Sequence, residues 1–383
     1  MSESFGFNEE TQHKAKNYLY SGLRMSLCKS VVIFVLALLA LGLGLSTASE
    51  KSIQSYVSEL SLIVFLYTLI GYGIFWLVSL PFDYYKGYVL EHKFELSTET
   101  LGVWFRDKVK MSILFAIFIV SFAEGIYNFM WLDPTYWWLF LWVVAVFITA
   151  FIMYVSPVLI MPLFFKFPRL KDEELLSRLT KLADKAGIKI IGVFEMKAEV
   201  KTKKATAALT GIGNTRRMLL SDTFLSNYST DEIESVMGHE IGHHIFGHIW
   251  KFALLLSGFF LFALFITSQI AQPVSTFFNL GHINAVSSLP LLALVFGLLY
   301  VGFTPLMNTL SRLAEGHCDQ YELDLVQKPD AYISSMVKLC DQNLRYAYPS
   351  SFTEFMFYDH PSGKKRVKRA LAYTPSTQSG VDL

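Results

Sequence analysis

Six apolar runs, each of about the length that crosses a hydrocarbon core of roughly 30 Å, constrain the fold of this chain more than any other feature. They occupy residues 31–46, 60–82, 111–131, 136–165, 252–271 and 289–310. Of the 383 residues, 53% are hydrophobic and only 17% are charged, whereas soluble domains carry roughly 25% charged residues. We therefore predict an all-α polytopic membrane protein with six spans; a seventh or re-entrant segment near Pro157 and Pro162 is the open alternative.

The lysine and arginine residues alternate between the segments that join these runs. Segments 1–30, 83–110, 166–250 and 311–383 carry four, five, thirteen and nine of them, whereas 132–135 and 272–288 carry none. Cytoplasmic loops of membrane proteins hold the excess of positive charge. The alternation agrees with six crossings and predicts that both termini and the large polar insert lie in the cytoplasm.

The polar insert divides the chain into four parts. We assign 1–165 to four N-terminal spans with a cytoplasmic loop at 83–110, 166–250 to a catalytic domain, 251–310 to two further spans and 311–383 to a C-terminal catalytic segment. Apolar patterns within the insert predict a helix at 171–186 and extended segments at 188–194, 205–210 and 217–220. Ser229 and Glu232 form a capping-box signature that predicts a second helix. The insert is therefore a small α+β unit.

The second predicted helix of the insert carries the sequence His239-Glu240-Ile241-Gly242-His243. Residues four apart share a helix face, so the two imidazoles can bind one zinc ion while Glu240 reaches the water on that ion. Zinc lowers the pKa of such a water to about 7, and a carboxylate beside it can take its proton and pass it to the leaving amine. The motif predicts a zincin-type metallopeptidase.

A catalytic zinc needs a third protein ligand, and three residues compete for that role. His248 would suit a metzincin, but that pattern places Gly and His three and six residues after the second histidine, whereas here they fall at four and five. His317 and Glu315 both follow the last span. Asp319 lies one helical turn beyond Glu315 and can orient a ligand imidazole through its other nitrogen. We therefore favour Glu315 over His317 and His248.

The same segment resembles a known family. Ser-Arg-Leu-Ala-Glu at 311–315, with Asp319 beyond it, resembles the signature of the integral-membrane zinc metalloproteases typified by type I CAAX prenyl proteases. His360-Pro361, with Arg366 six residues after the histidine, resembles the C-terminal signature of that family, and the likeness extends over nearly the whole chain. The resemblance implies one zinc ion, with ligands His239, His243 and Glu315 and the general base Glu240. It also implies that His360 stabilises the oxyanion, that Arg366 supports that site and that Asp319 orients a ligand histidine.

The resemblance further implies a substrate and a place for it. Residues 207–211 resemble the edge strand of the family's active site, where an extended peptide adds by backbone hydrogen bonds. The expected substrate-binding residues are Ala207, Ala208, Leu209 and Thr210. The expected partners are the lipid bilayer and a peptide or protein substrate, which in this family can carry a lipid. Thr206 stands where the family often has Asn, and this difference bears on how the substrate is positioned.

Two departures from the family bear on source and substrate. The chain is shorter than the eukaryotic prenyl proteases, and it shows six spans where that group is usually described with seven. Both favour a prokaryotic relative in the inner membrane; a eukaryotic chain would lie in the endoplasmic reticulum membrane. They also keep open a rival function, that of a quality-control metalloprotease that cuts misfolded membrane proteins.

Other function classes fit the sequence less well. The net charge of +1 gives no bias toward nucleic acid, and we expect no nucleic-acid partner. The three cysteines lack Cys-x-x-Cys spacing, which supports neither a disulfide framework nor a thiolate metal site. A transporter or scaffold would make Glu124, a carboxylate inside the third run, the functional residue. His244 and His248 are expected to be polar helix residues near the membrane surface.

Overall fold

The structure, a computed structural model, describes residues 5–374. Six helices in this part of the chain are long and apolar enough to cross a membrane. They extend over Glu9–Gly42, Leu60–Lys93, Leu101–Leu132, Trp137–Leu163, His248–Phe277 and Val286–Val326. The predicted six-span fold is confirmed. The segment around Pro157 and Pro162 belongs to the fourth of these helices and does not form a seventh span.

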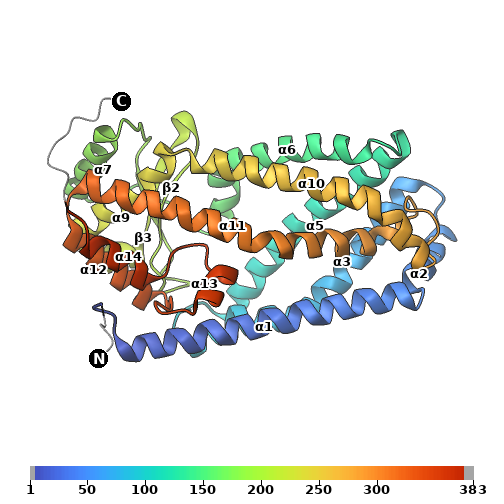
Figure 1. The fold of residues 1–383 in the computed structure, drawn as a ribbon, viewed down its shortest axis with the longest axis horizontal. Helices are drawn as coiled ribbons and strands as arrows, with labels where there is room; N and C mark the ends of the chain where they lie inside the picture. The colour runs from blue at the N-terminus through green and yellow to red at the C-terminus, as the bar shows by residue number, and fades with distance from the viewer. Residues whose placement is uncertain (1–4, 375–383) are drawn as a thin grey trace.

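The long helices run along the longest axis of the molecule, and a small sheet lies at one end (Figure 1). The bundle consists of α1 (Glu9–Gly42), α3 (Leu60–Tyr84), α5 (Leu101–Leu132), α6 (Trp137–Val155), α10 (His248–Phe277) and α11 (Leu289–Val326). Helix α2 (Leu45–Gln54) lies at the end of the bundle opposite the sheet. A π-helical turn at Tyr85–Val89 joins α3 to α4 (Leu90–Lys93), and a second π-helical turn at Ser156–Ile160 and a 3₁₀ turn at Met161–Leu163 follow α6.

Several bundle helices extend beyond the apolar runs. Helix α1 begins at Glu9, where Asn8 Oδ1 accepts a hydrogen bond from the N–H of Thr11 at 2.8 Å. The segment 83–110, predicted as a loop, is helical except at 94–100. Hydropathy marks where a chain leaves the bilayer, whereas a helix continues through polar residues of good helix propensity. The helices therefore project from the membrane toward the sheet.

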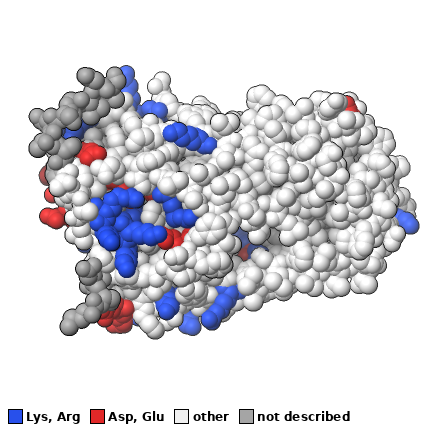
Figure 2. All heavy atoms as spheres, in the orientation of Figure 1, with Lys and Arg blue, Asp and Glu red and all other residues white. Residues whose placement is uncertain are grey.

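The surface is divided into a charged part and an apolar part. Charged side chains gather at the end that carries the sheet, and the other half of the visible face is almost free of them (Figure 2). Large apolar side chains on the bundle helices are exposed, for example Leu77 at 63%, Phe147 at 71% and Val301 at 64%. Such an extensive apolar surface is unfavourable in water and favourable against lipid. The protein is therefore a multi-pass membrane protein.

A small α+β unit precedes α10. It begins with α7 (Glu173–Lys185) and ends with α8 (Asp222–Asn227) and α9 (Thr230–Ile245). Between them, β1 (Val193–Met196) pairs in parallel with β3 (Arg217–Ser221), and β2 (Ala207–Thr210) pairs antiparallel with the other side of β3. The first strand is shorter than predicted and begins after Gly192, whose φ of +148° departs from strand geometry. β2 is an edge strand of this sheet.

The C-terminal segment is mainly helical. After α11 it forms α12 (Pro329–Gln342), α13 (Ser351–Phe357) and α14 (Gly363–Leu371). Tyr332 and Met336 of α12 pack against Val367 and Ala370 of α14 in a buried cluster. The sequence predicts a frayed tail at 375–383, which lies outside the described residues. The buried cluster formed by α12 and α14 holds α14 beside the end of α11.

Helix α9 begins at the predicted capping box. Ser229 Oγ accepts from the N–H of Glu232 at 3.4 Å, and Glu232 Oε2 accepts from the N–H of Ser229 at 2.7 Å. These bonds satisfy two backbone donors that the first turn of a helix leaves open. Met237 and Ile241, farther along α9, are fully buried in the core beneath the sheet.

Two glycines allow α9 to pack closely against α11. A Cβ atom at Gly238 would lie 2.7 Å from Val326 Cγ2, and one at Gly242 would lie 3.3 Å from the Cα of Cys318. The atoms nearest to the added Cβ at Gly242 include the backbone of Cys318, which cannot rotate away as a side chain can. The spacing between these helices therefore depends on the absence of a side chain at Gly242.

We expect Gly242→Ala to destabilise the protein although alanine favours helices over glycine by about 1 kcal/mol. Overpacking of this kind costs about 1–3 kcal/mol and should also lower the metal content of the purified protein. Gly102→Ala, at an exposed position of α5 with no atom within 4 Å of the added Cβ, is the matched control and should be neutral or stabilising. Thermal unfolding in detergent measures both; equal behaviour of the two variants would contradict the packing argument.

Candidate metal centre

Three metal-ligating side chains meet between α9 and α11. His239 and His243 come from α9, and Glu315 comes from α11. The Nε2 atoms of the two histidines are 3.3 Å apart, and they lie 3.1 and 3.2 Å from the two carboxylate oxygens of Glu315. His239 and Glu315 are buried, and His243 is half-buried. The structure thus brings together the three residues that the sequence favoured as ligands.

The spacing and polarity of this cluster fit a metal ion. Nitrogen and oxygen ligands at about 2.0–2.2 Å from a tetrahedral ion stand roughly 3.3–3.6 Å apart, close to the distances found here. Glu315 Oε2 is buried and lies 3.1 Å from His239 Nε2, the nitrogen that would face a metal. His239 Nε2 cannot supply a proton to it while facing a metal, so a cation is the natural partner of this oxygen. Three protein ligands leave one position open, as in catalytic sites.

A buried ion pair holds the other ring nitrogen of His239. Its Nδ1 lies 3.1 Å from Asp319 Oδ1, and Arg366 Nε lies 3.1 Å from the same oxygen. Arg366 is always a donor, so Asp319 accepts the Nδ1 proton and leaves Nε2 free for a metal. Burial disfavours the charged form of His239, but hydrogen bonds to Asp319 and Glu315 outweigh burial and raise its pKa to about 10. A metal that binds here must therefore displace a proton.

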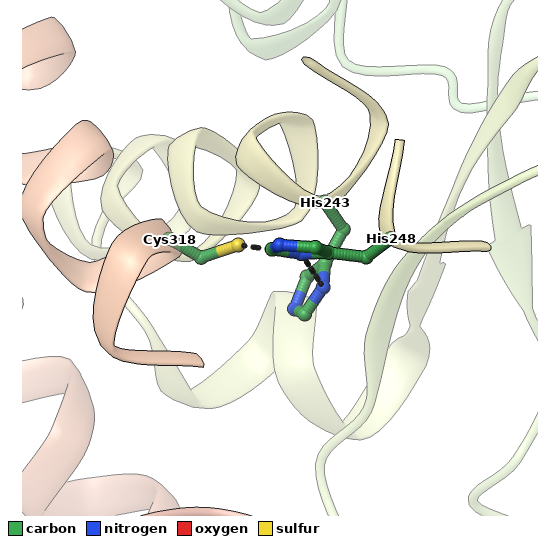
Figure 3. A group of neighbouring side chains, drawn as sticks. All are labelled: His243, His248 and Cys318. Carbon is green, nitrogen blue, oxygen red and sulfur yellow. Dashed lines mark hydrogen bonds between the residues drawn. The ribbon is translucent and has the colours of Figure 1, made fainter. Parts of the chain in front are cut away.

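The other ring nitrogen of His243 faces His248, beside Cys318 (Figure 3). The Nδ1 atoms of the two histidines are 3.2 Å apart, and Cys318 Sγ lies 3.5 Å from His248 Nδ1. When His243 presents Nε2 to a metal, its Nδ1–H can donate to His248, which then orients this ligand as Asp319 orients His239. These three residues also form a second possible metal-binding group, which the cysteine spacing in the sequence did not indicate.

His248 reaches this place because the chain turns between α9 and α10. Helix α9 ends at Ile245, Gly247 adopts a left-handed conformation with φ +63°, and α10 starts at His248. Counting residues along one continuous helix therefore misplaces His248. It is 4% exposed and contacts a candidate ligand; as the first residue of a membrane-spanning helix it is a polar helix residue with a local hydrogen-bond partner, as expected, but the sequence did not indicate its contact with His243. His317, by contrast, is exposed and packs near the ring of Phe246.

A cavity of about 580 Å³ borders the ligand cluster. Its wall includes His239, Glu240, His360, Arg366 and Ala207. His360 Nε2 lies 3.3 Å from Glu315 Oε1, and Asp359 Oδ1 accepts a hydrogen bond from His360 Nδ1 at 2.8 Å. The carboxylate of Glu240 and the imidazole of His360 therefore face a space beside the three ligands that can hold water and part of a peptide.

Side chains of α11 position the segment that leads to His360. Arg312 Nη1 donates to the carbonyl oxygens of Glu354 and Tyr358 at 2.9 and 2.5 Å. The Glu354 carboxylate accepts from the N–H of Ser362 at 2.9 Å and from Lys365 Nζ at 2.6 Å. Burial opposes the charged form of Glu354, but these partners prevail and lower its pKa. Arg312, which the sequence singled out only as part of a signature, thus ties α13 to the helix that carries Glu315.

The edge strand β2 lies beside α9. His244, expected to be a residue of the membrane surface, is half-buried, and its Nε2 lies 2.8 Å from the carbonyl oxygen of Leu209. Burial lowers the pKa of His244, so the neutral ring donates this bond. Glu124, the rival functional residue, is half-buried on α5 and accepts from Asn128 Nδ2 at 3.1 Å. It does not line the cavity beside the ligands.

The chain is similar to proteins of known family along nearly its whole length. The profile described as Peptidase family M48 matches residues 169–374. The profile described as CAAX prenyl protease N-terminal, five membrane helices, matches residues 3–166, where four of the six spanning-length helices lie. The metalloprotease YhfN of Bacillus subtilis is 32% identical over 302 residues, which cover 77% of this chain and 70% of that protein.

A yeast protein and a solved structure extend the comparison. CAAX prenyl protease 1 of Saccharomyces cerevisiae is 30% identical over 326 residues, covering 78% of this chain and 69% of that one. The crystal structure of S. mikatae Ste24p matches with a TM-score of 0.84 at 23% identity and covers 97% of this chain and 91% of that chain. At this identity the structural match establishes the shared fold.

The ligand set makes a prediction about metal content. Glu315→Ala should remove most of the bound metal, because one of three protein ligands is lost. His317→Ala, two residues along the same helix but exposed, should retain it. His248→Ala should fall between them, with affinity reduced roughly 10- to 100-fold through the loss of an orienting partner. Metal analysis of the purified variants decides; loss of metal in His317→Ala but not in Glu315→Ala would reverse the assignment.

Proposed function

This chain belongs to peptidase family M48 and is a membrane metalloprotease, and on that basis we propose that its metal is one zinc ion held by His239, His243 and Glu315. The observation that carries the proposal is the spacing of 3.1–3.3 Å between their ligand atoms. Two imidazoles and one carboxylate form a donor set that zinc prefers. A bound zinc ion would act as a Lewis acid that acidifies water and polarises the scissile carbonyl group.

The remaining chemistry belongs to side chains around the cavity. Glu240 accepts the proton of the attacking water and delivers it to the leaving amine. His360 donates a hydrogen bond to the oxygen that becomes negatively charged, and preorganised donors of this kind are worth several kcal/mol in hydrolysis, about 2.7–4 in one measured case. Asp319 holds His239 in the required tautomer, and Arg366 holds Asp319. In this proposal Asp319 and Arg366 are positioning residues.

The substrate is a peptide bound in extended form along β2. Ala207, Ala208, Leu209 and Thr210 form the edge of the sheet, and an edge strand offers unpaired backbone groups to a peptide. Ala207 borders the same cavity as Glu240. Backbone pairing places a carbonyl group near the ligands with little demand on side chains. Processing of CAAX-type, lipidated chains fits this site best because several curated relatives are named CAAX prenyl proteases.

We further propose that the metal centre lies on the cytoplasmic side of an inner membrane. The excess of basic residues in 166–250 and 311–383 supports this orientation. Similarity to a protein of Bacillus subtilis supports a bacterial membrane; in a eukaryote the corresponding place would be the endoplasmic reticulum. The two segments must share one side of the membrane because both contribute ligands.

Glu240→Gln should bind metal normally and lose at least 99% of its peptidase activity, because the amide has nearly the same size but cannot accept a proton. The assay compares a prenylated CAAX peptide, its unprenylated twin and an unfolded membrane protein, with wild type and variant in parallel. Preference of the wild type for the prenylated peptide supports CAAX-type processing. Equal cleavage of the unfolded protein supports quality control instead, and substantial activity in metal-loaded Glu240→Gln would remove Glu240 from the mechanism.

Orientation is testable by labelling single cysteines in intact bacterial cells. Asn284→Cys lies in the exposed loop between α10 and α11, Ser226→Cys in the α+β unit and Lys364→Cys on α14. The background replaces Cys28, the exposed native cysteine, and keeps the buried Cys318 and Cys340. An impermeant maleimide should label the Asn284 position before permeabilisation and the other two only after it. Labelling of either of those two from outside would reverse the orientation.

A further inference from the structure

The backbone groups of β2 alternate between its partner strand and its free edge. The N–H of Ser221 donates to the carbonyl oxygen of Thr206 at 2.9 Å, so Thr206 faces β3. The N–H of Met218 donates to Gly192 at 3.2 Å, on the β1 side, so the residue opposite Met218, which is Leu209, is not bonded to β3. In an antiparallel pair every second residue faces away from the partner. Ala205, Ala207 and Leu209 therefore present their N–H and C=O groups to the free edge.

Two side chains already occupy parts of this edge. Asn343 binds Ala205 twice: its Oδ1 accepts from the N–H at 2.8 Å, and its Nδ2 donates to the carbonyl oxygen at 2.9 Å. The amide of Asn343 thus pairs with Ala205 as a peptide group of a neighbouring strand would. At the other end, His244 Nε2 donates to the carbonyl oxygen of Leu209 at 2.8 Å. No side chain in residues 5–374 bonds to the backbone of Ala207, which lies between them.

We propose that Asn343 and His244 fix the register of a bound peptide by occupying backbone groups of Ala205 and Leu209, and we call them register stops. Ala207 is then the one residue of β2 that can form a complete backbone pair with a substrate. The inference rests on the proposed function, since it assumes a peptide that pairs with β2. A substrate residue opposite Ala207 exchanges two hydrogen bonds with it. At the next equivalent positions, both backbone groups of Ala205 are bonded to Asn343, and the carbonyl oxygen of Leu209 is bonded to His244. Neither residue can therefore form two hydrogen bonds with a substrate residue. A peptide is therefore held at one register.

This register decides which peptide bond reaches the metal ligands. Ala205 and Ala207 line the large cavity with Glu240 and His360, whereas His244 and His243 line a separate small cavity of about 30 Å³. Asn343 borders the large cavity and His244 borders the small one. A slip by one hydrogen-bonded step moves a peptide by two residues, or roughly 6.8 Å. Such a slip would bring a different bond to the ligands.

The proposal also defines the substrate class. The residue opposite Ala207 must carry both a free N–H and a carbonyl group, so proline or an N-methylated residue is excluded there. Because only one residue forms a full pair, a short extended segment suffices, and recognition by a long added strand is not required. Selectivity must then come from contacts in the cavity rather than from backbone length.

The test follows the cleavage position in a long unstructured peptide by mass spectrometry. Asn343→Ala opens Ala205 and should raise the products displaced by two residues at least tenfold. Asn343→Asp keeps the acceptor for the N–H of Ala205 and loses only the donor to its carbonyl oxygen, so it should show a smaller shift in the same direction. The matched control is Gln342→Ala, whose Nε2 donates to Lys203 at 2.8 Å outside β2, and it should cut as the wild type does. His244→Phe should allow a slip in the opposite direction.

N-methylation of successive peptide residues provides a second readout that does not depend on a variant. Only methylation opposite Ala207 should lower kcat/KM, by roughly 2- to 10-fold for one lost hydrogen bond. Unchanged products in both Asn343 variants, or an even response to methylation, overturns the register inference while leaving peptidase function intact. A wild-type protein that neither binds nor cuts the peptide overturns both.

Discussion

The close approach of α9 to α11 is the contact on which the candidate metal centre depends. His239 and His243 are separated from Glu315 by more than seventy residues and by the whole of α10. The missing side chains at Gly238 and Gly242 allow the two helix backbones to come close. The carboxylate of Glu315 then lies within about one hydrogen-bond length of both imidazoles. A bulkier residue on this face would separate the ligands without altering any of them.

That same contact buries an unusual amount of charge. Glu315, Asp319 and Glu322 occupy successive turns of α11 and are 3%, 0% and 2% exposed. Buried carboxylates are unfavourable unless cations or donors compensate them. Arg366 from α14 compensates Asp319, and Ser235 from α9 donates to Glu322. Glu315 and Glu322 each have one buried carboxylate oxygen for which the described residues supply no well-placed donor. The oxygen of Glu315 lies beside His239 Nε2, at the place where a metal ion would bind.

The features that sequence predicted share one property: each is encoded within a short segment. The apolar runs, the capping box at Ser229 and the spacing of His239 and His243 depend on neighbours along one helix. The contact of His248 with His243 could not be predicted in this way, because Gly247 interrupts the helix and the residue spacing of a continuous helix does not apply beyond it. Asn343 gave no signal at all, since its contact with Ala205 joins residues 138 positions apart. Long-range contacts of single polar side chains leave no periodic trace in a sequence.

The connections of α9 and α11 give the lipid a mechanical role. Only Phe246 and Gly247 separate α9 from the membrane helix α10, and α11 continues unbroken from the apolar part of the bundle to Glu315. The ligand cluster is thus joined to the membrane helices by a two-residue turn on one side and by an unbroken helix on the other, and the tilt of membrane helices responds to hydrocarbon thickness. A change in hydrocarbon thickness that tilted α10 against α11 would therefore reach the ligands over a short connection. Membrane composition would then be a variable in the geometry of the metal centre.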